Sequence, residues 1–347
     1  MKLTEPLRRP RPHHRCRTTP WSRTAAVLAA LAMALVAGAC AGGQDAAIDA
    51  TGIGDHGNGI AAEVASYDLV AGRPGRFIVG LFAADRQRLV GYGSVELAFR
   101  FLGSRGQQLY PPREGPRARA SFLPIPGQTA DQPGSSPRFV NGSEIIGVYG
   151  ADPVAFAEPG FWEVEVTADI DGEKRRTTTA FEVLADSDIP APGDLAPVTR
   201  QPLAGDDHVP AKAIDSRAGA GESVPDPELH NETVADAIAA HRPIMVVMST
   251  PTYCQSRFCG PITDSVQALA SEYGSDEVAF VHLEIWRDFE AKQLNPEVIE
   301  WIAPTGTEDA REPWVFTVGR DGRIVERFDN VATDAELEAA VRRLLRP

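Results

Sequence analysis

The sequence predicts an all-β sandwich followed by an α/β domain. Two observations carry this prediction: hydrophobic residues alternate with period two over about residues 64–184, and after His230 apolar runs alternate with helical periods. A length of 347 residues and a hydrophobic content of 43% provide enough apolar side chains for two packed cores with tails.

The period-two pattern in the first half is clear in several short segments. The positions that alternate in this way are Val95, Leu97, Phe99, Phe101, Trp162, Val164, Val166, Thr177, Thr179, Phe181 and Val183, all apolar except the two β-branched threonines. Asp171-Gly172 separates two of the segments and is typical of a two-residue hairpin turn. Short strands with no helical period between them favour an immunoglobulin-like β-sandwich over residues 63–186. Residues 111–137, rich in Pro, Gly, Ser and Arg, are expected to form a long surface excursion.

Residues 187–227 are rich in Pro, Gly, Ala and Asp, and we expect a semi-extended linker there. The α/β domain then covers residues 228–347. Its expected elements, in order, are a short helix capped by Thr233, a buried strand over 244–248, a helix with Ile262, Val266, Leu269 and Tyr273 on one face, a second buried strand over 278–285, a short helix over 296–301, a hairpin over 314–328, and a last helix opened by a capping box over 333–336.

Cys254 and Cys259 lie directly after the first buried strand of the α/β domain. A thiolate is the attacking species in disulfide exchange, and a helix N-terminus or a cation such as Arg257 favours it. Positions i and i+5 of a regular helix are about 8–9 Å apart at Cα, whereas a disulfide needs less than about 7 Å. Cys254 is therefore expected on the loop and Cys259 at the start of the helix, with Pro261 in its first turn.

The order β-α-β-α-β-β-α, the segment Thr252-Tyr253-Cys254 through Cys259-Gly260-Pro261 and the segment Glu312-Pro313-Trp314 together resemble the thioredoxin superfamily. The resemblance implies that Cys254 attacks or is attacked, that Cys259 resolves the mixed disulfide, and that Pro313 is a cis-proline shaping the substrate groove. No organic cofactor and no metal are implied. The whole chain is also similar to exported actinobacterial-type lipoproteins that join a β-sandwich to such a domain.

Several positions depart from that family, in which the usual spacing is Cys-x2-Cys. Tyr253 stands in place of its Trp, Met248 in place of its buried acid, and Glu312 places a carboxyl near the thiols that opposes thiolate formation. A static structural disulfide is therefore an alternative. Peroxidase activity is disfavoured, because Val247 and Pro251 replace the residues that peroxiredoxins require. A copper site would need His282, which in a strand is more often a packing residue.

The N-terminus has the layout of an export signal over residues 1–39, with a basic stretch that ends at Arg23 and an apolar run that follows it. The run closes on Val36-Ala37-Gly38-Ala39-Cys40, which resembles the lipobox of bacterial lipoproteins and implies a diacylated Cys40 followed by a flexible tether over 40–62. An uncleaved membrane anchor is the alternative. In either case the protein is expected on the extracytoplasmic face of the cell membrane.

Removing the basic signal would leave a mature chain with a net charge of −20, against −14 for the whole chain, and such a surface excludes nucleic acid as an expected partner. Only Cys254 and Cys259 would then remain as thiols, and in an oxidising compartment they are expected to pair. The sequence thus predicts a membrane-anchored thiol–disulfide oxidoreductase acting on exported protein thiols or disulfides. The alternative is a non-catalytic envelope binding or scaffold lipoprotein that engages a protein partner through the β-sandwich and holds a structural disulfide.

Overall fold

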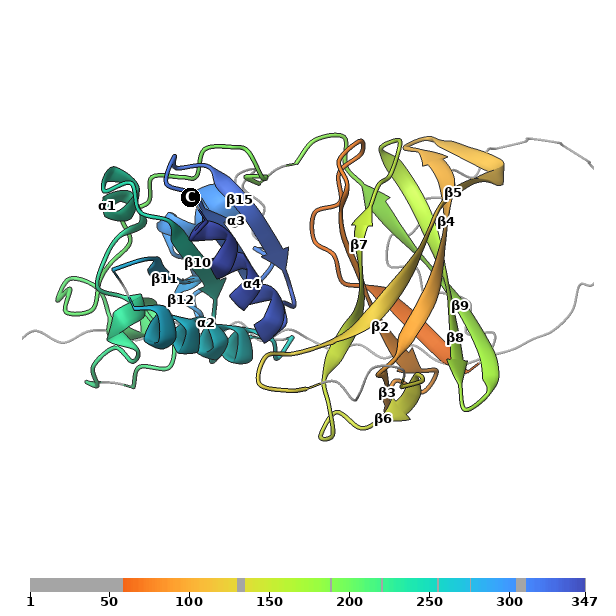
Figure 1. Cartoon of the computed structure of the whole chain (residues 1–347), viewed down its shortest axis with the longest axis horizontal. Helices are drawn as coiled ribbons and strands as arrows, with labels where there is room; N and C mark the ends of the chain where they lie inside the picture. The colour runs from red at the N-terminus through yellow and green to blue at the C-terminus, as the bar shows by residue number, and fades with distance from the viewer. Residues whose placement is uncertain are drawn as a thin grey trace, which may run out of the picture. The chain divides into compact units, whose positions relative to one another are not determined.

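The computed structural model describes residues 59–129, 135–187, 189–219, 221–254, 256–274, 276–303 and 310–346. They belong to one compact unit and are mostly β-sheet with few helices (Figure 1). The predicted signal over 1–39 and the predicted lipid site Cys40 lie outside the described residues. None of the helices in these ranges is long and apolar enough to span a membrane.

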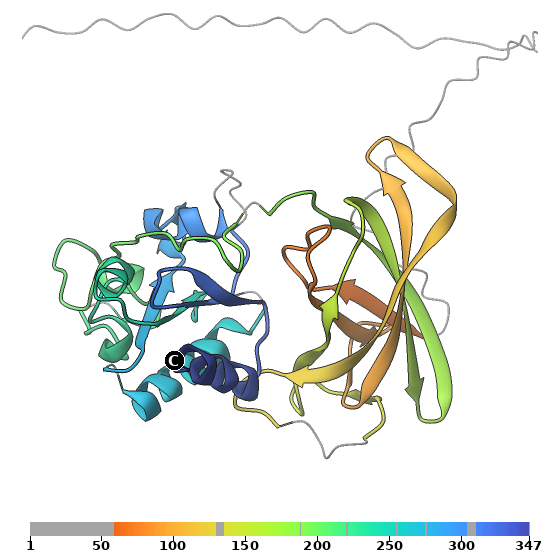
Figure 2. The same ribbon diagram turned by 45° about the horizontal axis from the view of Figure 1, so that its top comes forward.

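Nine strands form the first sheet. They are β1 (Ile60–Val64), β2 (Gly75–Ala83), β3 (Leu89–Gly91), β4 (Ser94–Ser104), β5 (Gln107–Pro124), β6 (Arg138–Val140), β7 (Gly147–Val154), β8 (Gly160–Ile170) and β9 (Glu173–Val183). The sheet order is β6-β3-β2-β7-β5-β4-β8-β9, with β1 paired to β2. All nine strands contribute side chains to one core, around which they wrap in Figure 2. The predicted alternation is confirmed: Phe99 and Val164 are fully buried, while Glu96 between buried neighbours is exposed.

The hairpin between β8 and β9 shows why the turn prediction succeeded. Asp171 and Gly172 have φ angles of 55° and 80°, the left-handed pair that a tight two-residue turn between twisted strands requires. The eleven residue pairs from Gly160↔Val183 to Ile170↔Glu173 follow without a register shift.

Two expectations for the first half are corrected. The predicted surface excursion over 111–137 is largely strand, because β5 runs to Pro124; the register shifts near Gly115-Pro116, and a bulge there accommodates a proline that cannot donate to the ladder. The predicted tether over 40–62 ends too late, since β1 begins at Ile60, which is fully buried.

The second sheet has four strands in the order β11-β10-β14-β15, namely β10 (Ile244–Ser249), β11 (Ala279–Glu284), β14 (Trp314–Val318) and β15 (Ile324–Asp329). Strand β10 is buried at every position, pairs in parallel with β11 and antiparallel with β14, and occupies the centre as its apolar run predicts. A small additional pair is formed by β12 (Trp286–Asp288) and β13 (Gln293–Leu294).

Helices cover both faces of the second sheet. One core contains side chains of α1 (Val234–Ala239) and α3 (Pro296–Ile302), and the other contains side chains of α2 (Cys259–Tyr273) and α4 (Asp334–Leu344). The caps predicted at Thr233 and Thr333 are present, and at Thr333 both hydrogen bonds of the capping box form with Glu336. The element order β-α-β-α-β-β-α is thus that expected of a thioredoxin-like fold.

The segment predicted as a semi-extended linker over 187–227 packs against the second sheet instead. Ala196 belongs to one of the apolar cores of that sheet. The backbone N–H of Ile324 donates to the carbonyl of Asp194, and the Trp301 indole N–H donates to Thr199 Oγ1 at 2.7 Å. One 3-10 turn, Ala211–Ala213, lies within this segment, and a second, Pro227–Leu229, begins at its end. Proline-rich composition signalled the lack of regular structure, but the buried apolar and polar side chains hold the segment in place.

Candidate functional site

The two cysteines lie where the spacing argument places them. Cys254 is on the loop after β10, Cys259 is the first residue of α2, and a disulfide joins them with Cα atoms 6.0 Å apart. This separation lies within the range that a disulfide spans, which two positions five apart in a regular helix would exceed. Arg257, between them in sequence, is exposed.

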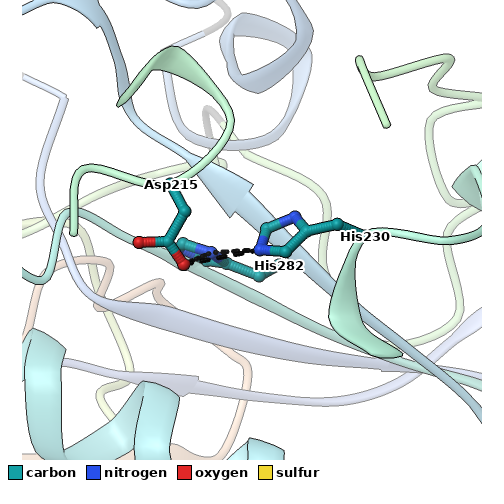
Figure 3. Close-up of side chains that lie close together, drawn as sticks. All are labelled: Asp215, His230 and His282. Atoms are coloured by element: carbon teal, nitrogen blue, oxygen red, sulfur yellow. Dashed lines mark hydrogen bonds and ion pairs between the residues drawn. The ribbon is translucent and has the colours of Figure 1, made fainter. Parts of the chain in front are cut away.

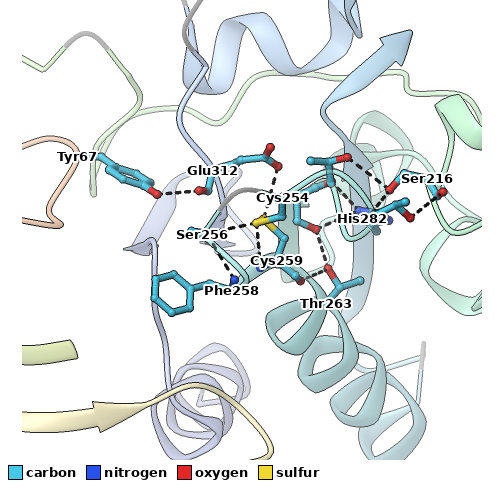
Figure 4. The surroundings of a disulfide bond; sticks show 12 residues. Tyr67, Ser216, Cys254, Ser256, Phe258, Cys259, Thr263, His282 and Glu312 are labelled. Atoms are coloured by element: carbon cyan, nitrogen blue, oxygen red, sulfur yellow. Dashed lines mark hydrogen bonds between the residues drawn. A yellow bond between two sulfur atoms is a disulfide. The ribbon is translucent and has the colours of Figure 1, made fainter. Parts of the chain in front are cut away.

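The surroundings distinguish the two sulfur atoms (Figure 4). Cys259 is fully buried, whereas Cys254 is half-buried. The Sγ of Cys254 accepts the backbone N–H of Cys259 at 3.4 Å and lies 3.2 Å from the Ser256 hydroxyl, which can donate to it. Donors from the first turn of a helix stabilise negative charge, so Cys254 is the sulfur better placed to become a reactive thiolate after reduction.

Pro313 lies directly before β14, and the Glu312–Pro313 peptide is cis, as the resemblance implied. The side chain of Glu312 extends to the disulfide, with Oε2 3.6 Å from Cys259 Sγ. The structure therefore brings together Cys254, Cys259 and Pro313, which the sequence singled out, and adds a carboxyl group to them.

The carboxyl of Glu312 has a pKa above the ordinary range of a glutamate. Its removal from water raises its pKa to about 8, and the negative charge of Glu284 adds to the shift. A disulfide sulfur carries no proton, so a hydrogen bond between the two groups requires the carboxyl to donate. A neutral Glu312 carboxyl at 3.6 Å from Cys259 fits that requirement.

Residues near the first sheet contact the loops of this site. The hydroxyl of Tyr67 donates to the carbonyl of Glu312 at 2.7 Å, and its ring lies edge-on to Trp314 at 5.7 Å. Phe258, directly before Cys259, packs in an apolar cluster with Ile78 of β2. No local sequence pattern indicates these contacts, because they join residues about 180 to 250 positions apart.

A second polar cluster lies beside the site. Asp215, His230 and His282 are buried and converge on one another (Figure 3). Asp215 comes from the packed 189–219 segment, His230 from the turn before α1, and His282 from β11. The sequence predicts a packed or edge residue at His282, and its side chain is buried. Its partners Asp215 and His230 are distant in sequence, and no pattern of the sequence indicates them.

Burial and mutual hydrogen bonds shift the pKa values of these three side chains in different directions. Burial raises the pKa of Asp215, but hydrogen bonds with His230, His282 and Arg217 outweigh it and hold that pKa well below its usual range. Burial lowers the pKa of His230. At His282 the effect of burial is outweighed by Asp215, and the net pKa is raised.

Hydroxyl groups link the polar cluster to the cysteines (Figure 4). The Nε2 of His282 lies 3.1 Å from the Ser249 carbonyl oxygen and 3.1 Å from its hydroxyl, and that hydroxyl lies 2.6 Å from the hydroxyl of Thr263. Thr263 in turn donates to the carbonyl of Cys259 at 2.8 Å. A buried hydrogen-bonded path thus runs from β11 to the first residue of α2.

Comparisons with known proteins add little to this geometry. No protein-family model matches the chain, and no curated protein matches it. Among solved structures, a thiol:disulfide interchange protein of the thioredoxin family from Chlorobium tepidum TLS is similar to it at 12% identity and a TM-score of 0.28, over 44% of this chain and 100% of that one.

Proposed function

We propose that this protein is a membrane-anchored, extracytoplasmic thiol–disulfide oxidoreductase that uses Cys254 and Cys259. The observation that carries the proposal is the disulfide at the N-terminus of α2, beside cis-Pro313, with one half-buried and one fully buried sulfur. This is the asymmetry that such chemistry needs, because an accessible thiolate attacks and a protected thiol resolves.

In the reductive direction the thiolate of Cys254 attacks a disulfide of an exported protein. One substrate thiolate leaves, and a mixed disulfide forms. Cys259 then attacks Cys254 Sγ, which closes the Cys254–Cys259 bond and releases the second substrate thiolate; two electrons pass to the substrate. The same steps in reverse oxidise a substrate dithiol. Glu312, 3.6 Å from Cys259 Sγ, is placed to exchange a proton with that thiol, and Pro313 would shape the groove for the substrate peptide.

An insulin-reduction assay tests the catalytic role. We expect the wild-type protein to accelerate insulin reduction by dithiothreitol, and Cys254→Ser to abolish the acceleration because no attacking thiolate remains. A matched control is Ser271→Ala, an exposed substitution on α2 far along the helix from the cysteines. Equal rates for the wild type and Cys254→Ser would rule out the redox function.

Anchoring through a lipid on Cys40 is part of the proposal and has its own test. The lipobox-like segment that ends at Cys40 supports it. We expect Cys40→Ala to block processing or release the protein from membranes. Normal processing with full membrane retention would contradict the lipid anchor.

We also propose that the first sheet is an immunoglobulin-like sandwich forming one domain and the second sheet another. Strand β5 supports this, because its first part pairs with β4 and its last residues, Ser121 to Pro124, pair with β7. A strand that changes partners in this way joins the two layers of a sandwich. Separate apolar cores under the two sheets favour two domains.

A binding or scaffold lipoprotein with a structural disulfide is the second candidate. The packing of Phe258 against the apolar cluster of Ile78, Val148 and Val331 favours it, since this packing restrains the loop between the two cysteines. In that case an envelope protein would be bound through the sandwich, and the disulfide would resist exchange. The reduction potential of the pair separates the two candidates.

A further inference from the structure

The side chains of Asp215, His230 and His282 are almost completely withdrawn from solvent, with exposed fractions of 0%, 1% and 0%. Polar groups in such positions are ordinarily matched by close partners of opposite character. Here each of the three contributes one potential ligand atom to the same small volume (Figure 3). They are Asp215 Oδ2, His230 Nε2 and His282 Nδ1.

The distances among these three atoms are equal. Asp215 Oδ2 lies 3.4 Å from His230 Nε2 and 3.4 Å from His282 Nδ1, and the two nitrogen atoms lie 3.4 Å from each other. These separations are long for hydrogen bonds between nitrogen and oxygen, which are usually about 2.7–3.2 Å. Zinc bonds of about 2.0–2.1 Å place tetrahedral ligand atoms about 3.3–3.4 Å apart, whereas octahedral geometry at the same bond length gives only about 2.8–3.0 Å. The equal spacing therefore fits three corners of a tetrahedron.

The neighbouring groups leave the right atoms available. The Nε2 of His282 lies 3.1 Å from the carbonyl oxygen of Ser249, which can only accept, so Nε2 carries the proton and Nδ1 presents its lone pair in the neutral ring. Holding the second nitrogen of a histidine in this way is the usual support for a metal ligand. One lone pair of Asp215 Oδ2 accepts from Arg217 at 2.7 Å, and the oxygen retains capacity for a second bond.

The local charge also suits a divalent cation. Arg217 contacts three carboxylates, those of Asp215, Asp226 and Asp264, at 2.7, 2.6 and 3.2 Å. One guanidinium and three carboxylates together carry a net charge of −2, which a divalent cation would neutralise. Asp215 is fully buried, whereas Asp226 is partly exposed and Asp264 is exposed.

We propose that Asp215, His230 and His282 form a binding site for one zinc-type divalent cation. Two imidazoles and one carboxylate are a zinc ligand set that leaves a fourth position for water or another small ligand. The cation would tie the packed 189–219 segment and the turn before α1 to β11, and the path through Ser249 and Thr263 leads from it to Cys259. This site does not depend on the thiol chemistry proposed above.

Metal titration of the mature chain tests the site. The protein is purified without a histidine tag, with the disulfide oxidised so that no thiol can bind metal, and is stripped with a chelator. We expect one Zn²⁺ per chain, and Co²⁺ to give the intense visible absorption of a tetrahedral site. Asp215→Asn and His230→Gln should each weaken Zn²⁺ binding by roughly 100-fold or more, beyond the loss typical of a supporting residue. His208→Gln and His241→Gln, both exposed, should bind as the wild type does.

Failure of a buried variant to fold does not remove the test, because the wild type alone can decide it. Zn²⁺, but not Mg²⁺, should raise the thermal midpoint of the stripped wild-type protein, since a ligand that binds only the folded state stabilises it. A folded wild-type protein that binds no Zn²⁺, or Zn²⁺ affinity unchanged in folded Asp215→Asn and His230→Gln, would overturn the site. Either result would leave the insulin assay with Cys254→Ser unaffected.

Discussion

At the residue scale, the chain places its two disulfide-bonded cysteines in unlike surroundings. Cys254 is half-buried, and its sulfur accepts a hydrogen bond from the backbone N–H of Cys259 and lies near the hydroxyl of Ser256. Cys259 is buried, and its sulfur lies near the carboxyl of Glu312. Donors favour a thiolate, and an adjacent acid together with burial disfavours one. The attacking and resolving roles proposed for the two cysteines would therefore follow from neighbouring groups rather than from the cysteines themselves.

Alkylation of the reduced protein tests this division. We expect iodoacetamide to modify Cys254 well before Cys259. Ser256→Ala should slow modification of Cys254 by about fivefold, because a single hydrogen bond contributes about 1 kcal/mol. Ser271→Ala should not change the rate. Equal reactivity of the two thiols in the wild type would show that the asymmetry has no chemical effect.

Glu312 should give the oxidised protein a distinct pH dependence. Its pKa of about 8 in the folded state lies above the ordinary 4.5, so between these values the folded protein holds a proton that the unfolded chain releases. The contribution to the free energy of unfolding is full below about pH 4.5 and is lost as pH rises through about 8.

We therefore expect Glu312→Gln to lose less stability than the wild type between pH 5 and 8, by roughly 2 kcal/mol after discounting the full shift for solvent screening. Urea unfolding across this range measures the difference. The neighbouring Glu284 remains in both proteins, and the exposed Glu300→Gln serves as the control. Parallel pH profiles for wild type and Glu312→Gln would mean that Glu312 is charged in the folded state.

Residues identified by local pattern were found where the pattern predicts, and residues assembled from distant segments were not. Cys254, Cys259 and Pro313 stand at fixed places relative to strands and a helix, so the sequence was sufficient to bring them together. Asp215 and His230 precede His282 by 67 and 52 positions and follow no spacing motif. Only the packing of an irregular segment brings them to β11.

At the element scale, α2 and the loop before it are held by different interactions. The helix packs through Ile262, Val266 and Leu269 into a core shared with α4. The loop is held by the disulfide, by Phe258, and by Thr252, whose N–H and hydroxyl bond to Ser216. The apolar contacts of the helix do not depend on the disulfide.

Amide hydrogen exchange on the oxidised and reduced proteins should separate these two elements. On reduction we expect faster exchange at Ser256, Arg257 and Phe258, with little change over 266–273, because local opening follows the loss of local restraints. Loss of protection along the whole of α2 would identify the disulfide as a staple for the domain.

Element prediction from sequence was most accurate where one face is buried and turns are short. Strands β4, β8 and β9 and the helices α2 and α4 follow their apolar periods. Strand β5 was not predicted, because Pro, Gly and Arg obscure its alternation. In the structure a bulge accommodates the proline, and Arg113 packs on the ring of Phe101 at 4.9 Å in a cation–π contact. The composition of this segment indicates its local preferences but not its pairing with β4 and β7.

At the scale of the whole molecule, polar contacts join residues around the first sheet to the second. Arg76 of β2 is mostly buried, donates to the carbonyl of Val331, and pairs with both oxygen atoms of Glu336 at 3.0 and 3.1 Å. Asn330 donates to the carbonyl of Ala65 at 3.1 Å. These hydrogen bonds link residues next to the two sheets. The backbone N–H of Asn330 also donates to the carbonyl of Pro313, so one of the linking residues is bonded to the cis-proline.

Arg76→Ala should lower the free energy of unfolding by about 2–3 kcal/mol, because it removes a charge-assisted, bidentate interaction and leaves a backbone carbonyl without its donor. Arg73→Ala, an exposed arginine three positions earlier, should change stability by less than about 0.5 kcal/mol. Urea unfolding measures both. Similar losses for the two variants would show that the contacts of Arg76 are not stabilising.

The most direct measurement of the central claim is the reduction potential of the Cys254–Cys259 pair, obtained by equilibrating the mature protein with glutathione buffers and trapping its thiols. The proposed function predicts a pair that exchanges with glutathione and has a potential above about −300 mV. A pair that does not exchange, with a potential below about −300 mV, would contradict that function and identify the bond as structural.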